Sequence, residues 1–84
     1  MDKYYNEEPI EINIYDVIER IYNLKYDQLA KMLNVSSGVV CYARTRGTIA
    51  RRAAEFSNKL NLPIKYFKKV TNLDIPEIEK ALLK

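Results

Sequence analysis

The chain of 84 residues has the length of a single small domain. Fourteen Lys and Arg residues against eleven Asp and Glu residues give a net charge of +3, and the sequence contains one cysteine and no histidine. This composition excludes an internal disulfide, and no catalytic triad, metal-ligand spacing or phosphate-binding glycine loop is visible. We therefore expect a protein that is not an enzyme and needs no cofactor. With neither a signal peptide nor a membrane-spanning run, it is expected in the cytoplasm.

The charge is distributed unevenly along the chain. Residues 36–69 contain eight cations and a single acidic residue, Glu55, whereas residues 1–35 and 70–84 carry net charges of −3 and −1. The middle segment therefore has a net charge of +7. A basic segment between two acidic ends favours a polyanionic partner such as a nucleic acid.

The N-terminal residues 1–13 are predicted to be a flexible arm, because they are polar and contain Pro9. Ile10, Ile12 and Ile14 alternate with polar residues, so a short strand is the alternative. The two interpretations are a loose terminus and an arm that pairs with a partner subunit.

From Ile14 onward the apolar spacing changes to that of a helix, which we expect over residues 14–23. Asp16 and Glu19 lie near its start, where acidic side chains interact favourably with the helix dipole. Its apolar face is expected to consist of Ile14, Val17, Ile18, Ile21 and Tyr22.

The next segment is predicted to form two helices, at residues 26–33 and 36–45, joined by a tight turn. Asn34 tolerates the left-handed conformation that ends a helix, and Ser36 is a suitable N-cap for the second helix. The small side chain of Ala30 allows the two helices to approach closely. This pattern is typical of a helix-turn-helix.

Three further helices are expected at residues 49–60, 63–68 and 76–83, with Thr48 as the N-cap of the first and Asn61 ending it. The side of the first helix that faces the core is expected to consist of Ile49, Ala50, Ala53, Ala54, Phe56 and Leu60. The core anchors around the second are expected to be Ile64, Phe67 and Val70. In the last, a contact with a second subunit could be made by Ile78, Leu82 and Leu83.

The segment LAKMLNVSSGVVCYARTRGTIARRAAEFSNKLNLPIKYF resembles the N-terminal DNA-binding domain of bacteriophage CI-type repressors. The matching positions are Ala30, Val35, Ser36, Val40, Arg46, Gly47, Leu60, Leu62 and Phe67. Two positions depart from the family pattern: Asn34 replaces the usual glycine, and Ala43 replaces a large aromatic anchor, for which Tyr42 could partly substitute.

The resemblance implies a compact, all-α, lambda-repressor-like domain of five or six helices. Residues 14–70 would be the helix-turn-helix DNA-binding domain, and residues 71–84 a C-terminal helix that serves as a linker or dimer contact. The protein would be a phage or prophage repressor of the CI or Cro type, acting at the nucleoid in a bacterial host cytoplasm. It would be either the DNA-binding part of a longer repressor or a short Cro-like regulator.

The helix at residues 36–45 is predicted to enter the major groove of operator DNA. Contacts with base edges are expected from Ser36, Ser37, Gly38, Cys41, Tyr42 and Thr45. Contacts with phosphates are expected from Gln28, Arg44, Arg46, Arg51 and Arg52. The competing interpretations are that Ser36 only caps the helix, that Tyr42 only covers the core, and that the arginines form a solvated basic face. Three further cations are expected to be peripheral, namely Lys65, Lys68 and Lys69.

Few long side chains on this helix can bind a purine edge at two points, so one domain should discriminate weakly between sequences. A homodimer on double-stranded operator DNA is therefore expected, with no small-molecule substrate and no membrane partner. The alternative is a protein-interaction module, such as an antitoxin or anti-regulator, that uses the same fold.

Overall fold

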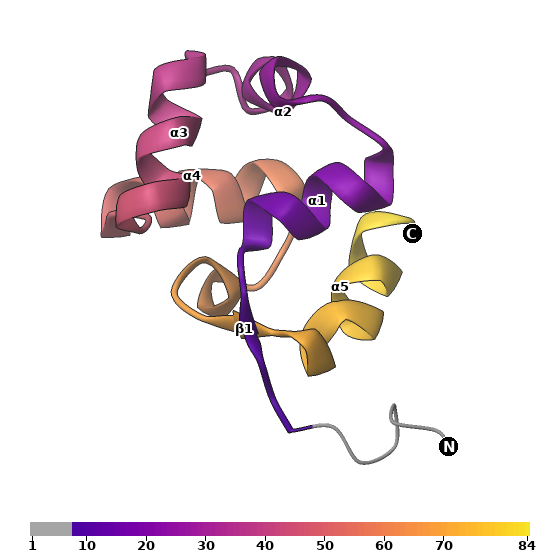
Figure 1. The fold of residues 1–84 in the computed structure, drawn as a ribbon. Helices are drawn as coiled ribbons and strands as arrows, with labels where there is room; N and C mark the ends of the chain where they lie inside the picture. Colours follow the sequence, from indigo (N-terminus) through magenta and orange to yellow (C-terminus); the bar gives the residue numbers. More distant parts are fainter. Residues whose placement is uncertain (1–7) are drawn as a thin grey trace.

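The computed structural model describes residues 8–84 of the chain, and most of these residues lie in helices (Figure 1). The α-helices in this part are α1 (Ile14–Tyr22), α2 (Tyr26–Leu33), α3 (Ser37–Arg46), α4 (Ala50–Leu60) and α5 (Ile75–Leu82). Two short strands, β1 (Glu11–Ile12) and β2 (Val70–Thr71), and two 3₁₀ helices, η2 (Ile64–Phe67) and η3 (Asn72–Asp74), complete the described elements.

Local sequence signals set the ends of the helices. Asn23, Asn34 and Asn61 follow α1, α2 and α4 and have φ values of 56°, 61° and 58°, the left-handed conformation that ends a helix. The Ser36 Oγ accepts a hydrogen bond from the Val39 N–H at 3.4 Å and so caps α3. The predictions for Asn34, Asn61 and Ser36 are confirmed. The Asn13 Oδ1 caps α1 in the same way, accepting from the Tyr15 N–H at 2.9 Å.

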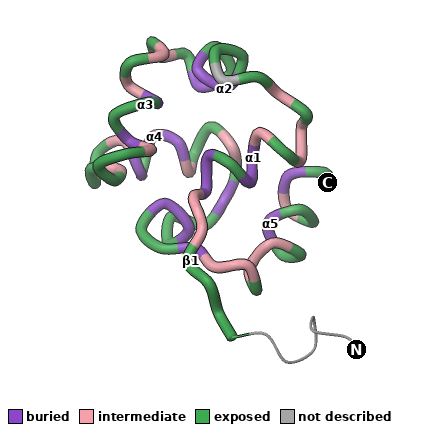
Figure 2. The backbone as a smooth tube through the Cα atoms, in the orientation of Figure 1, coloured by how far each residue is buried: buried purple, intermediate pink, exposed green. Residues whose placement is uncertain are grey.

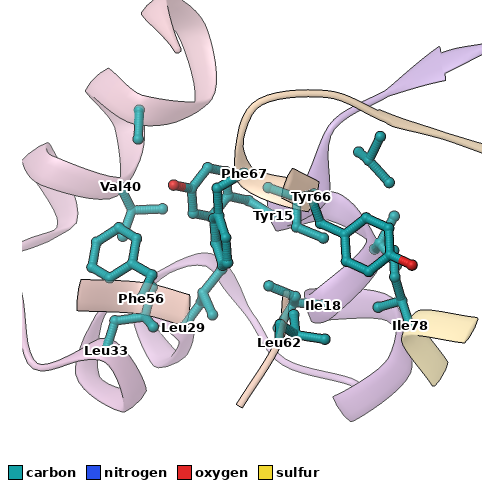
Figure 3. Packing of buried hydrophobic residues seen from close by; sticks show 14 of the residues in the cluster. Tyr15, Ile18, Leu29, Leu33, Val40, Phe56, Leu62, Tyr66, Phe67 and Ile78 are labelled. Atoms are coloured by element: carbon teal, nitrogen blue, oxygen red, sulfur yellow. The ribbon is translucent and has the colours of Figure 1, made fainter. Parts of the chain in front are cut away.

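Three aromatic rings form the centre of the core (Figure 3). The ring centroids of Tyr15, Phe56 and Phe67 lie 6.1–6.3 Å apart in edge-to-face or tilted pairs, a favourable arrangement for aromatic side chains. They come from α1, α4 and η2, so the rings join the first helix to two elements in the second half of the chain. Around them the core is completed by residues of α2, α3 and α5, including Leu29, Leu33, Val40 and Ile78.

The structure corrects the expected arm for the part of it that is described. β1 pairs with β2 in an antiparallel ladder, with Glu11 opposite Thr71 and Ile12 opposite Val70. The strand alternative is therefore confirmed, and its partner lies in the same chain. The purely helical expectation is corrected by this small sheet. The first part of the predicted arm, residues 1–7, lies outside the described residues.

The inward face of α4 is narrower than expected. Ala53 and Phe56 are buried, but Ala50 and Ala54 are exposed, and Ile49 is 51% exposed. Ala54 lies one residue, or about 100°, away from the buried stripe, and Ala50 belongs to the first turn, which extends beyond the core.

Residues 63–68 were expected to form an α-helix but contain the 3₁₀ helix η2. Ile64, an expected core anchor, is 41% exposed, whereas Tyr66 and Phe67 are buried. Burial, with the nearby carboxylates of Glu77 and Asp74 acting in the same direction, raises the pKa of Tyr66 to about 12.

Helix α5 packs on the domain through the residues that were expected to reach a second subunit. Ile78 and Leu82 are 0% and 8% exposed, and the Tyr22 hydroxyl donates a hydrogen bond to the Leu82 carbonyl at 2.8 Å. These two side chains belong to the core, which corrects their expected role, while Leu83 remains 59% exposed. Within residues 8–84, no helix has the length and apolar character needed to cross a membrane.

Candidate nucleic-acid interface

Helices α2 and α3 pack against each other around small and branched side chains. Ala30 and Val40 are buried, and the Val35 N–H donates to the Ala30 carbonyl at 3.0 Å, which holds the turn against the end of α2. Along α3 the buried positions are Val40 and Ala43, and the others are half-buried or exposed (Figure 2). One side of α3 is thus fixed to the domain, and the opposite side faces solvent.

The residues predicted to contact bases lie together on this one helix and its cap. Tyr42 is 57% exposed, so it does not serve as a core residue. The Ser36 hydroxyl caps the helix, and the Thr45 hydroxyl donates to the Cys41 carbonyl at 2.9 Å. Ser37 is half-buried, and the exposed members of the set are Ser36, Gly38, Cys41, Tyr42 and Thr45.

A hollow of about 350 Å³ separates α3 from the start of α4. Tyr42 and Ile49 supply exposed apolar surface at this hollow, and Arg51 and Arg52 line it from α4. The Arg46 guanidinium lies over the Tyr42 ring at 5.9 Å from its centroid, within the range of a cation–π contact. An exposed aromatic ring is therefore bordered by positive charge from both helices.

The predicted phosphate contacts differ in their surroundings. Arg46 and Arg51 are exposed and form no ion pair with any residue in the range 8–84. Arg52 pairs with Glu55 at 2.9 Å, and Lys59 pairs with the same carboxylate at 2.9 Å. The hydrogen bond from Lys59 and then that from Arg52 lower the pKa of Glu55 below its ordinary value.

Gln28 has a local role at the start of α2. Its Oε1 accepts a hydrogen bond from the Lys25 N–H at 2.7 Å, which satisfies a backbone donor in a capping box. The side chain is exposed and bonds through its Oε1 atom, so capping and a further contact through Nε2 are compatible.

The surroundings of Arg44 differ from those expected for a phosphate contact. Its side chain is 20% exposed and forms ion pairs with two carboxylates of α1. The Nη2 atom lies 2.6 Å from Glu19 Oε2, and Nη1 bonds to Asp16 Oδ1. The structure thus holds this arginine against α1, whereas Arg46 and Arg51 form no ion pair within residues 8–84.

The loop between α3 and α4 is anchored to the core. Ile49 is the N-cap residue of α4, which corrects the expected cap at Thr48. The Thr48 Oγ1 instead shares a hydrogen bond of 2.7 Å with the Tyr15 hydroxyl. Burial raises the pKa of Tyr15, and the Thr48 hydrogen bond and the charge of Arg44 partly oppose that rise.

Two lysines that were expected to be peripheral border this loop. Lys68 and Lys69 line a hollow of about 170 Å³ together with Gly47 and Thr48. Both lysines are exposed, and neither forms an ion pair within the described part of the chain. The basic surface therefore continues from α3 across the loop to the turn before β2. The run of cations in residues 36–69 was the signal for it.

The described residues contain no group of three or more His, Cys, Asp or Glu side chains that could hold a metal ion. Cys41 is a free, exposed thiol. No protein-family model, curated protein or solved structure matches this chain.

Proposed function

We propose that this protein is a sequence-specific, double-stranded DNA-binding repressor of the phage or prophage CI or Cro type. In this proposal α2 and α3 form the helix-turn-helix of a lambda-repressor-like domain, and α3 enters the major groove. The main support is the outer side of α3, where the exposed Tyr42 is flanked by Arg46 and Arg51, two cations without an ion pair in residues 8–84.

The chemistry of α3 favours contacts with thymine and with the edges of several bases. Gly38 is exposed and has no side chain, so the backbone of the first turn can approach the DNA closely. The Tyr42 ring and the Cys41 thiol are suited to packing on thymine methyl groups, and the hydroxyls of Ser37 and Thr45 can bond to base edges.

The phosphate contacts in this proposal come from both sides of α3. Arg46 and Arg51 are the principal ones, with Gln28 and Arg52 beside them, and they set the position of the domain without reading sequence. Lys68 and Lys69 extend the same surface across the loop after α3. Such contacts release counterions, so binding should weaken steeply as salt increases.

A single copy of this domain has little capacity for discrimination, because α3 carries few side chains that form bidentate contacts with bases. We therefore propose that two copies bind half-sites about one duplex turn apart. The exposed Leu83 is a candidate for the contact between copies, since Ile78 and Leu82 are buried within the domain. In a bacterial host such a protein would act in the cytoplasm, at the nucleoid.

Selection of bound fragments from a random duplex pool tests the proposal directly. We expect a palindromic site, with affinity that falls steeply between low and moderate salt. Tyr42→Ala should change the preferred sequence, whereas Arg46→Gln should weaken binding to all duplexes alike. Lys80→Gln is the matched control, because Lys80 is exposed on α5, on the side of the molecule away from α3 (Figure 1). The absence of an enriched sequence, or a flat response to salt, would refute the proposal.

A second candidate function is a protein-interaction module, such as an antitoxin or anti-regulator. The apolar surface of Tyr42 and Ile49 beside Arg51 favours it, because such a hollow also fits an acidic protein segment with an apolar side chain. Under this alternative, Tyr42→Ala and Ile49→Ala would both abolish capture of a protein partner, and no duplex would be retained by the wild-type chain.

A further inference from the structure

Helix α3 is tied to the start of α1 by two different groups of Arg44. Its guanidinium bonds to both Asp16 and Glu19, and its backbone carbonyl accepts a hydrogen bond from the Asn13 Nδ2 at 3.0 Å. The pair with Glu19 is partly buried, since the Arg44 and Glu19 side chains are 20% and 18% exposed. Ion pairs of this kind are screened less by salt than fully exposed pairs.

The bonds of Arg44 to α1 are made from a helix that buries few apolar side chains. The buried side chains of α3 are Val40 and Ala43, and the alanine contributes only a methyl group to the core. Because little apolar area holds the C-terminal half of α3, the ion pairs and hydrogen bonds of Arg44 add a second restraint on its position. Helix α1 is itself fixed in the core by Tyr15 and Ile18, which are 1% and 0% exposed. The bonds of Arg44 therefore connect α3 to a firmly packed helix.

We propose that Arg44 is a positioning residue that fixes α3 for DNA recognition and does not contact a phosphate. This inference rests on the proposed DNA-binding function. Two carboxylates share one guanidinium, so the cluster carries a net charge of −1, which repels a phosphate. Both terminal nitrogens of Arg44 also bond to these carboxylates.

Glu19→Gln distinguishes the two roles by the sign of its effect. The substitution keeps the size of the side chain and removes a negative charge near the interface, so electrostatics alone predicts tighter binding to every duplex. If Arg44 positions α3, the same substitution should weaken binding to the selected site by about tenfold, the order expected for loss of a charged hydrogen bond. Binding to random duplex should stay equal or increase.

The salt dependence of Arg44→Gln gives a second readout. A phosphate contact would reduce the slope of log affinity against log salt by about one. A positioning residue leaves that slope unchanged while the ratio of selected-site to random-duplex affinity falls. Glu79→Gln, at an exposed carboxylate of α5, is the matched control for the change in charge. Tighter binding by Glu19→Gln, or a slope reduced by one in Arg44→Gln, would overturn the inference.

Amide hydrogen exchange separates this inference from the proposed function, because it requires no DNA. In Arg44→Gln we expect the amides of α3 to lose about tenfold of their protection, while those of α5 keep theirs. Unchanged protection of α3 relative to α5 would overturn the positioning role even if the protein binds DNA. Conversely, if the wild-type chain selects no duplex but Arg44→Gln shows the loss of protection in α3, the proposed function is refuted and the restraint on α3 is supported.

Discussion

Replacing Asn34 with alanine tests how the turn between α2 and α3 is held. Asn34 has φ 61° and ψ 45°, and in this conformation its N–H donates to the Lys31 carbonyl and the Val35 N–H donates to the Ala30 carbonyl, both at 3.0 Å. Asn34 is exposed, so the substitution removes no buried surface. Its effect should therefore come from backbone conformation alone.

A residue with a Cβ atom in the left-handed conformation costs about 1–2 kcal/mol, and asparagine tolerates that conformation better than alanine. We therefore expect Asn34→Ala to lower the free energy of unfolding by about 1 kcal/mol. In a domain of this size, that loss corresponds to a decrease in Tm of about 4–8 °C, which thermal unfolding followed by circular dichroism would measure. Asn34→Gly should keep Tm near the wild-type value, because glycine adopts a positive φ without steric cost.

Asn61 provides a control at a different place in the fold. It ends α4 with φ 58°, so Asn61→Ala should lower Tm by a similar amount. At a temperature where both alanine variants are folded, only Asn34→Ala should weaken DNA binding, because Asn34 determines how the chain enters α3. Equal Tm values for Asn34→Ala and Asn34→Gly would refute the conformational argument.

Three further predictions concern the core, the pH response and the basic surface. Phe56→Ala should cost about 3–5 kcal/mol in chemical denaturation, because the ring is fully buried among aromatic partners; a loss below 1 kcal/mol would contradict the core assignment. The pKa of Tyr66 is raised from 10.0 to about 12, so the folded state holds this proton more tightly than the unfolded state. The contribution of Tyr66 to stability should therefore be constant below pH 10 and decrease from pH 10 toward pH 12, and Tyr66→Phe should flatten the decrease in this range. Changing Lys68 and Lys69 together to Gln should weaken binding to all duplexes and reduce the salt slope by roughly one per lysine, whereas an unchanged slope would exclude these residues from the phosphate surface.

The positions of the helices could be predicted from the sequence because the signals are local. The left-handed asparagines, the cap at Ser36 and the 3.6-residue apolar period act within one or two turns of the chain. For the same reason the helices at 14–23 and 26–33 were placed within a residue of α1 and α2. The basic middle segment was also visible as a simple count of charges.

The tertiary structure decided which residues face each other across long sequence distances. The pairing of Glu11–Ile12 with Val70–Thr71 joins residues about 60 positions apart, and no local pattern specifies such a partner. In the same way, the sequence shows Arg44 only as one of several cations. Its ion pairs with Asp16 and Glu19 result from the packing of α1 beside α3.

The sequence by itself therefore indicated the α-helices and the asparagines that end three of them, because these follow from interactions between near neighbours. The sign of the charge on the middle segment followed from the composition alone. The tertiary structure decided which cations remain available, since a charge is neutralised by whatever the fold brings within a few ångströms of it. Arg46 and Arg51 stay exposed beside Tyr42, while Arg44 is held by α1. Long-range packing, and not the residue type, separates these arginines.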